Sequence, residues 1–169
     1  MPDEIINRVA ESGIMNLDPA DFYPKEHILE LDIKPWLFQG LLLKEKDFRA
    51  YLKEHNWEQY SNNYVGVYCI ADAIIPQWAF MLLATYLSSC GAKYYLGQKE
   101  KVAQLVLSEN IQCHDYNQYR DAKVIIKGCG DYPIPDSAYL ELTKKLIPLA
   151  KSVMYGEACS TVPIYKKKK

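Results

Sequence analysis

Three cysteines and one aspartate have the types and positions of metal ligands. Cys69 ends the apolar run YVGVYCI, and Asp72 follows shortly after it. Cys129 stands between two glycines after AKVIIKG, and Cys159 lies in YGEACSTVP. Three thiolates and a carboxylate suit zinc first, and then iron or an iron–sulfur cluster with one non-cysteine ligand. Cys69, Asp72, Cys129 and Cys159 are therefore our candidate metal ligands.

The glycines beside Cys129 are consistent with a ligand loop. Gly128 and Gly130 carry no side chain, so the backbone there can approach an ion closely. Their amides, and the amino end of a helix predicted to begin near Ser137, would stabilise a thiolate. The spacing is less specific, because the three cysteines lie far apart and form no C-x-x-C pair. The alternative that these cysteines are small buried hydrophobic residues stays open.

A thiol enzyme with Cys129 as its nucleophile is another alternative. Such a cysteine needs a base, commonly a histidine, within hydrogen-bond reach. His27 opens a predicted strand, His55 ends a charged helix, and His114 stands in a polar stretch beside Cys113. The sequence brings none of these histidines close to Cys129, and it leaves open whether the protein is an enzyme.

Strands and helices alternate along the chain, which indicates the α/β class. Apolar runs predict strands over residues 27–33, 64–70, 93–97 and 122–128, with an edge strand at TVPIY. Helical periodicity or a longer apolar run predicts helices over residues 3–11, 44–55, 76–89, 100–109 and 137–154. We expect a single three-layer domain over residues 1–169, with a largely parallel sheet and crossover helices.

The carboxyl ends of parallel strands lie at one edge of a sheet, where ligands usually bind. Cys69 and Cys129 both stand at the ends of predicted strands, so we expect both thiols at that edge. Cys159 reaches the same edge only if the chain after Gly156 turns back over the sheet.

The composition limits the partners and the location that we expect. The net charge is -1 over 169 residues, so no general field attracts nucleic acid or anionic lipid. The terminal lysines, residues 166–169, are the one basic run, and we expect a disordered tail there. The first residues lack a secretory signal, and five cysteines are an odd number. We expect a cytoplasmic protein with free thiols that binds neither nucleic acid nor membrane.

Residues 73–92 carry no charge. Pro76, Gln77 and the polar end at Ser88 and Ser89 leave an apolar part too short to span a membrane. We expect a helix that is buried on most faces, with the remaining surface available as a homodimer interface. With 14 tyrosines in the chain, a metal-free interaction protein that uses this helix and a Tyr-rich surface is the alternative function.

Several blocks of the chain resemble a bacterial family catalogued as domain of unknown function 2480. They are DIKPWLFQGLLLKEKDFRAYLKEHNW, CIADAIIPQWAFMLLATYL, VIIKGCGDYPIPDSAYLELT and AKSVMYGEACSTVPIYK. The likeness covers nearly the whole chain, with the blocks in the same order. The resemblance implies a small cytoplasmic bacterial protein. Genes of this family tend to lie beside iron–sulfur assembly genes, so it also implies iron–sulfur assembly proteins as partners and a link to iron–sulfur or sulfur metabolism. It implies no catalytic residues.

Overall fold

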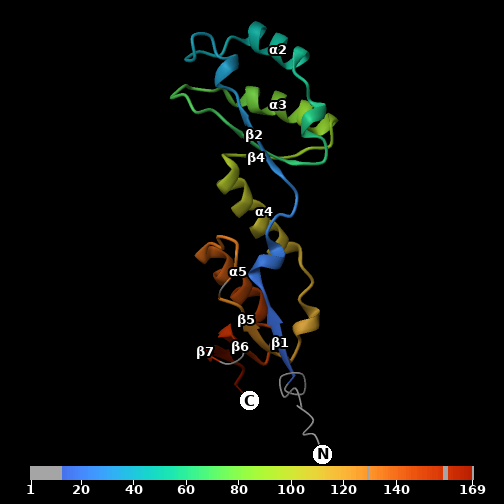
Figure 1. The fold of residues 1–169 in the computed structure, drawn as a ribbon, viewed down its shortest axis with the longest axis vertical. Coiled ribbons are helices and arrows are strands. Elements are labelled where there is room, and N and C mark those ends of the chain that lie inside the picture. The colour runs from blue at the N-terminus through green and yellow to red at the C-terminus, as the bar shows by residue number, and fades with distance from the viewer. Residues whose placement is uncertain (1–12, 129, 158–159, 169) are drawn as a thin grey trace, which may run out of the picture. The chain divides into compact units, whose positions relative to one another are not determined.

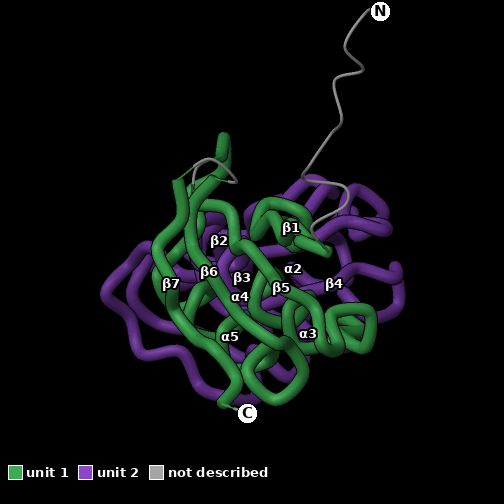
Figure 2. Tube along the Cα trace, turned by 90° about the horizontal axis from the view of Figure 1, so that it is seen from below, with its two compact units in different colours: residues 1–23, 106–169 green, residues 24–105 purple. Residues whose placement is uncertain are grey.

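The structure is a computed structural model that describes residues 13–128, 130–157 and 160–168 (Figure 1). The chain divides into two compact units, which Figure 2 shows in different colours. Unit 1 comprises residues 1–23 and 106–169, and unit 2 comprises residues 24–105. The division falls inside the helix α4 (Lys99–Cys113), so this helix contributes residues to both units.

Unit 2 contains a three-stranded sheet in the order β2-β3-β4, with both strand pairs parallel. Its strands are β2 (Ile28–Asp32), β3 (Tyr64–Tyr68) and β4 (Lys93–Leu96), and its helices are α2 (Glu45–Glu54) and α3 (Gln77–Ser89). Residues of both helices pack with β3 in one core, which includes Phe48, Leu52, Val65, Val67, Leu83 and Leu87. The apolar positions of each helix recur at helical spacing, so one face of each is buried.

Unit 1 contains a four-stranded sheet in the order β1-β5-β6-β7. Its strands are β1 (Ile14–Leu17), β5 (Lys123–Ile126), β6 (Ser152–Glu157) and β7 (Ser160–Lys166). The first three strands are parallel, and β7 pairs with β6 in the antiparallel sense. The helix α5 (Asp136–Leu146) connects β5 to β6 and buries Ala138, Leu142 and Leu146.

Four short 3-10 helices complete the described part of the chain. They are η1 (Pro19–Phe22), η2 (Lys34–Trp36), η3 (Glu58–Tyr60) and η4 (Asn117–Tyr119). Of these, η1 directly follows β1 and determines where the chain turns at the end of that strand.

The α/β class and the largely parallel arrangement of the strands are confirmed. The predicted strands correspond to β2, β3, β4, β5 and the edge strand β7, and four predicted helices correspond to α2, α3, α4 and α5. The helix predicted over residues 3–11 lies outside the described residues. No described helix is long and apolar enough to cross a membrane, the uncharged α3 included.

Two features of the secondary structure differ from the prediction. Strand β1 was not predicted, because a run of four residues carries little periodic signal. The helix predicted over residues 137–154 ends at Leu146, and β6 begins at Ser152. Pro148 has no N–H with which to continue a helix, and the β-branched and aromatic residues Val153 and Tyr155 favour a strand.

The strands are distributed over two sheets, and this corrects one prediction about the candidate ligands. β3, which precedes Cys69, belongs to the sheet of unit 2, whereas β5, which precedes Cys129, belongs to the sheet of unit 1. The prediction that these two strands share one sheet edge is therefore wrong. Within the expected basic tail, Lys166 is the last residue of β7, and the backbone N–H of Lys167 donates to the carbonyl of Lys151.

Candidate functional site

Three parallel strands of unit 1 end side by side. The register pairs Leu17 of β1 with Ile126 of β5, and Ile126 with Tyr155 of β6. The residues that follow these positions are therefore neighbours at the carboxyl edge of the sheet. In open α/β sheets this edge is the usual place for ligands.

Asp18 follows β1 directly and is oriented by the turn after it. One carboxylate oxygen, Oδ1, accepts a hydrogen bond of 2.9 Å from the backbone N–H of Ala20, so Asp18 caps η1. Pro19 stands at the start of this helix, where its missing N–H costs no hydrogen bond. The other oxygen, Oδ2, accepts a bond of 3.0 Å from Nζ of Lys127.

Lys127 follows β5, and its backbone N–H donates to the carbonyl of Leu17 at 2.9 Å. Its side chain forms an ion pair with Asp18 that is partly open to solvent. Burial alone would raise the pKa of Asp18. The hydrogen bond from the Ala20 amide, together with the hydrogen bond and the charge of Lys127, nevertheless holds this pKa below its ordinary value.

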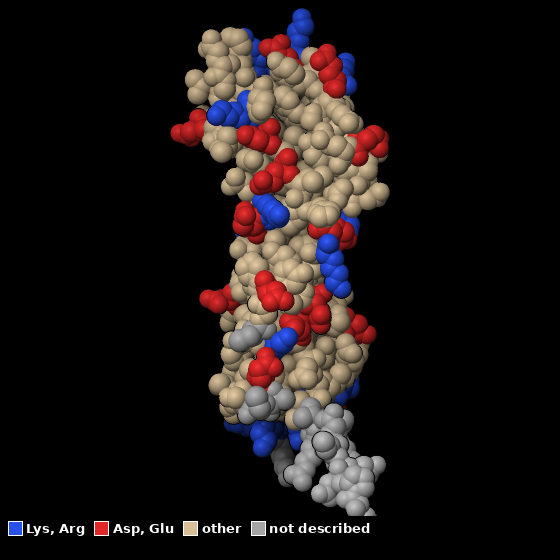
Figure 3. Space-filling view, in the orientation of Figure 1, with Lys and Arg blue, Asp and Glu red and all other residues tan. Residues whose placement is uncertain are grey.

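The carboxyl edge has an excess of negative charge. The hydrogen bond to Asp18 and its charge raise the pKa of Lys127, and the charges of Glu157 and Asp131 raise it further. The charges of three carboxylates therefore act on one ammonium group. On the face of the molecule that Figure 3 shows, acidic and basic side chains are interspersed. This edge would attract a cation more strongly than an anion.

Two hollows lie along this edge and share Asp18 and Lys127. The first has a volume of about 380 Å³ and adds Asn16, Asp21 and Glu157 to its lining. The second has a volume of about 410 Å³, and its lining includes Gly128, Gly130, Tyr132 and Tyr139. Both are built entirely from residues of unit 1.

Gly128 lies against the ring of Tyr155. A Cβ atom placed on Gly128 would lie 2.5 Å from Cζ and from Oη of Tyr155, closer than real carbon atoms approach. The backbone after β5 can therefore pass this close to β6 only because residue 128 has no side chain.

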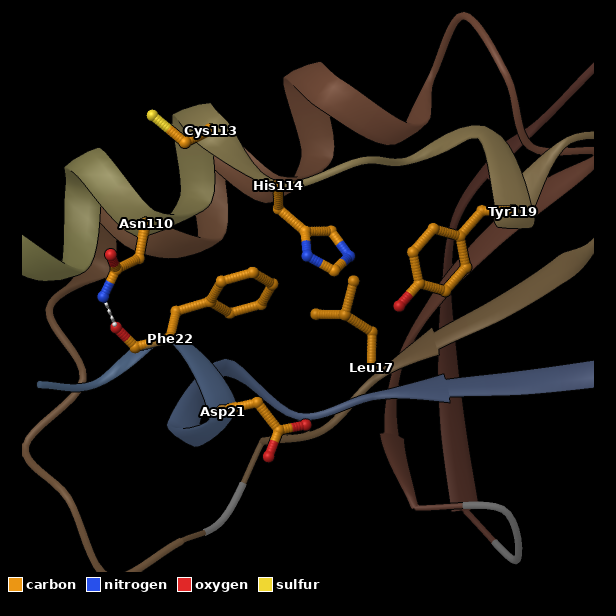
Figure 4. A pocket seen from close by; sticks show the side chains of 7 residues that line it. All are labelled: Leu17, Asp21, Phe22, Asn110, Cys113, His114 and Tyr119. Carbon is orange, nitrogen blue, oxygen red and sulfur yellow. Dashed lines mark hydrogen bonds between the residues drawn. The ribbon is translucent and has the colours of Figure 1, made fainter. Parts of the chain in front are cut away.

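A third hollow of about 340 Å³ shares Asp21 with the first (Figure 4). His114 and Tyr119 point into it, and the ring of His114 meets the ring of Phe22 edge-on at 5.1 Å between centroids. Burial and the charge of Asp21 raise the pKa of the Tyr119 hydroxyl. This hollow combines a carboxylate, an imidazole and a phenol, which could hold a small polar molecule by hydrogen bonds.

Cys113 lines the same hollow, but its sulfur points away from the ring of His114 (Figure 4). Cys113 is the last residue of α4 and His114 directly follows it, so the two side chains point in different directions. They do not form a nucleophile and base pair in this arrangement.

The four predicted ligands are placed as follows. Cys129 and Cys159 lie outside the described residues. Cys69 is half-buried and packs against the core of unit 2, and Asp72 is exposed in the same unit. Within residues 13–128, 130–157 and 160–168, no group of three or more His, Cys, Asp or Glu side chains could hold a metal ion.

The functional residues predicted from the sequence did not include Asp18, Asp21, Lys127 and Glu157. The signal that could have found Asp18 was the short apolar run IMNL directly before it, followed by an aspartate and a proline. Had that run been recognised as a parallel strand, Asp18 would have been expected at the same edge as the residues after β5.

The fold and this edge define an α/β protein with a candidate ligand site at the ends of parallel strands. The chain belongs to the family described as Protein of unknown function (DUF2480), whose family model matches residues 3–167. This confirms the resemblance seen in the sequence. No curated protein and no solved structure matches the chain.

Proposed function

We propose that the carboxyl edge of the unit 1 sheet binds a metal ion, zinc first, through the thiolates of Cys129 and Cys159. One or more of the nearby carboxylates of Asp18, Asp21 and Glu157 would complete the ligand set. Zinc accepts sulfur and carboxylate oxygen ligands in one site.

The observation that supports this proposal is the position of the neighbours of both cysteines. Gly128 and Gly130, on either side of Cys129, line one hollow of the edge, and Glu157, two residues before Cys159, lines the other. Both hollows include Asp18 and Lys127. The chain therefore leads to each cysteine from the same edge.

The charge of the edge favours a cation over a free thiolate. Among the described residues of this edge, the charges of Asp18, Asp131 and Glu157 act on Lys127, so negative charge is in excess there. Like charges disfavour ionisation of a thiol, whereas a bound cation reverses this effect. A metal ligand is thus a better role for Cys129 than an activated nucleophile.

The proposal narrows the ligands expected from the sequence. Cys69 and Asp72 follow a strand of the other sheet. They are therefore not expected at the sheet edge that follows β5, and they are omitted from the proposed ligand set. With two thiolates and oxygen ligands, zinc or mononuclear iron suits the edge better than an iron–sulfur cluster, which usually takes four cysteines. The cytoplasmic location and the link to iron–sulfur or sulfur metabolism rest on the free thiols and on the family resemblance.

Elemental analysis of the full chain, purified without chelators and without oxygen, tests the proposal. We expect one zinc or iron per chain in the wild type, and loss of the metal in Cys129→Ser and in Cys159→Ser. Cys69→Ser and Cys113→Ser are matched controls that replace a thiol elsewhere, and they should keep the metal.

Two results would overturn the proposal. One is a wild-type chain that holds no metal even after titration with zinc. The other is full retention of the metal by Cys129→Ser. Loss of the metal in Cys69→Ser as well would instead restore the four-ligand set predicted from the sequence.

A further inference from the structure

The strand β4 forms an edge of the sheet of unit 2. The backbone N–H of Lys93 donates to the carbonyl of Asn63 at 2.9 Å, and that of Gly97 donates to Val67 at 2.8 Å. Because backbone groups alternate in direction along a strand, the N–H and C=O groups of Tyr94 and Leu96 point away from β3. No other described strand pairs with this side of β4.

An apolar groove of about 170 Å³ lies between this strand and α3. Phe80 and Ala84 of α3 line it together with Tyr94 and Leu96 of β4. Leu96 is 64% exposed and Tyr94 is 38% exposed. On the outer face of α3, Met81 is 70% exposed. An uncovered apolar groove beside the open edge of a strand is typical of an interaction site.

The charge of this surface points to a second copy of the same chain as its occupant. A two-fold interface brings the same patch of both copies together, so any charge near the axis meets its like. Residues 73–92, which include all of α3, carry no charge, so this surface can meet itself without repulsion.

The one charged residue of β4 is engaged elsewhere. An edge-strand lysine normally blocks pairing with another strand. Nζ of Lys93, however, lies 3.4 Å from the hydroxyl of Tyr64 and 3.6 Å from Glu26. It also lies 4.8 Å from the centroid of the Tyr64 ring, over the neighbouring strand β3. The ammonium group is thus directed towards its own sheet.

We propose that the chain forms a homodimer in which β4 pairs with β4 of a second copy in the antiparallel sense, centred on Tyr95. In this register Tyr94 is opposite Leu96 of the second copy, and the outward backbone groups of both residues form the new hydrogen bonds. The side chains of these two residues lie on the α3 face, where the pair would cover the groove of each copy. The result is one continuous sheet of six strands.

Analytical ultracentrifugation of the full chain tests the dimer. At about 100 µM, where a dimer of micromolar Kd is formed, we expect twice the chain mass of 19.5 kDa. Leu96→Glu places two carboxylates beside the two-fold axis and should raise the Kd at least about 100-fold. Because Leu96 is largely exposed, the fold of the variant should be retained, which circular dichroism checks.

The matched control is Leu140→Glu. Leu140 is 74% exposed on α5 of unit 1, so this variant makes the same change on another surface and should leave the Kd unchanged. A monomeric wild type at this concentration would overturn the proposal. A dimer that Leu96→Glu does not weaken, or that Leu140→Glu weakens equally, would also overturn it.

Disulfide cross-linking tests the register. In the proposed dimer, residue 95 of one copy would lie opposite residue 95 of the other as a non-hydrogen-bonded pair. Their Cα atoms would be about 4.5 Å apart, a distance that a disulfide spans. Tyr95→Cys should therefore give a covalent dimer under mild oxidation, beyond any formed by the native cysteines. In Tyr94→Cys the two cysteines would be offset by about 7 Å along the strands, and no such gain is expected. An equal gain at both positions would overturn the register.

Discussion

Asp18 and Lys127, which lie 109 residues apart in the sequence, form an ion pair of 3.0 Å between the ends of β1 and β5. The pair links the edge strand β1 of the unit 1 sheet to the inner strand β5 beside it. Both residues line the two hollows of the carboxyl edge, so their charges act on any ligand that binds there.

Replacing Lys127 by methionine should strengthen metal binding. The ammonium group neutralises Asp18 and repels a cation, so its removal should tighten zinc binding by roughly tenfold. Isothermal titration with zinc measures the change. Lys123→Met is the control, because Lys123 stands at the opposite end of the same strand. Weaker zinc binding in Lys127→Met would contradict the proposal that the carboxyl edge binds a metal cation.

The coupling between Asp18 and Lys127 should depend on pH. The pKa of Asp18 is lower in the folded chain than its ordinary value of 3.8, because the Ala20 amide and Lys127 favour the carboxylate against the effect of burial. Its contribution to stability is therefore present above about pH 3.8 and is lost as the pH falls through the folded pKa. Urea unfolding of Asp18→Asn, Lys127→Met and the double variant should show a larger coupling energy at pH 7 than at pH 2. Equal coupling energies at pH 7 and pH 2 would contradict a charge interaction between the Asp18 carboxylate and Lys127.

His55 should lower the stability of the chain when it becomes protonated. Its ring stacks on Tyr60 at 5.7 Å and meets Trp36 and Trp57 edge-on at 5.1 and 4.7 Å. Burial among these rings lowers the pKa of His55 from 6.5. The folded chain thus favours the neutral imidazole, so this stability is present above pH 6.5 and decreases as the pH falls through the folded pKa.

Two measurements check this prediction. In an NMR titration, the ring protons of His55 should report a midpoint below 6.5. The free energy of unfolding should fall between pH 7 and pH 5, and His55→Gln should remove part of that fall. A midpoint above 6.5 would show that the neutral form is not the favoured one.

The two units should unfold together, as expected for a single domain. Leu142 is fully buried in the core of unit 1, and Leu142→Ala should cost about 2–5 kcal/mol. All three tryptophans, Trp36, Trp57 and Trp78, belong to unit 2. Because α4 belongs to both units, tryptophan fluorescence should report the loss of stability in unit 1.

The comparison of two signals decides this point. In Leu142→Ala, the urea midpoint from tryptophan fluorescence should shift together with the midpoint from far-ultraviolet circular dichroism. An unshifted fluorescence midpoint would show that unit 2 unfolds independently, and the chain would then have two domains.

Local patterns were sufficient for most of the secondary structure. Two examples are the Val- and Tyr-rich run at β3 and the uncharged run at α3. In each, the pattern of apolar residues within the segment predicts the element, because that pattern reflects which of its faces are buried. The sequence also indicated the α/β class and the edge position of β7 with its Pro163. The family was recognised from the resemblance of several sequence blocks, which the family model confirms.

The candidate site depended on information that no local pattern contains. Val124 and Val65 stand in equally apolar strands, and nothing near either residue says that these strands join different sheets. Asp18 was missed because β1 is only four residues long and gains its stability from pairing with β5.

The sequence by itself determined the class of the fold and the approximate limits of most strands and helices. It also indicated that the glycines around Cys129 allow the backbone to approach a ligand closely. The tertiary structure decided which strands are neighbours: it assigned the strand before Cys69 and the strand β5 to different sheets, and it brought Asp18 to Lys127. The physical reason is that periodicity records whether a residue is buried, whereas strand pairing depends on which distant segment buries it.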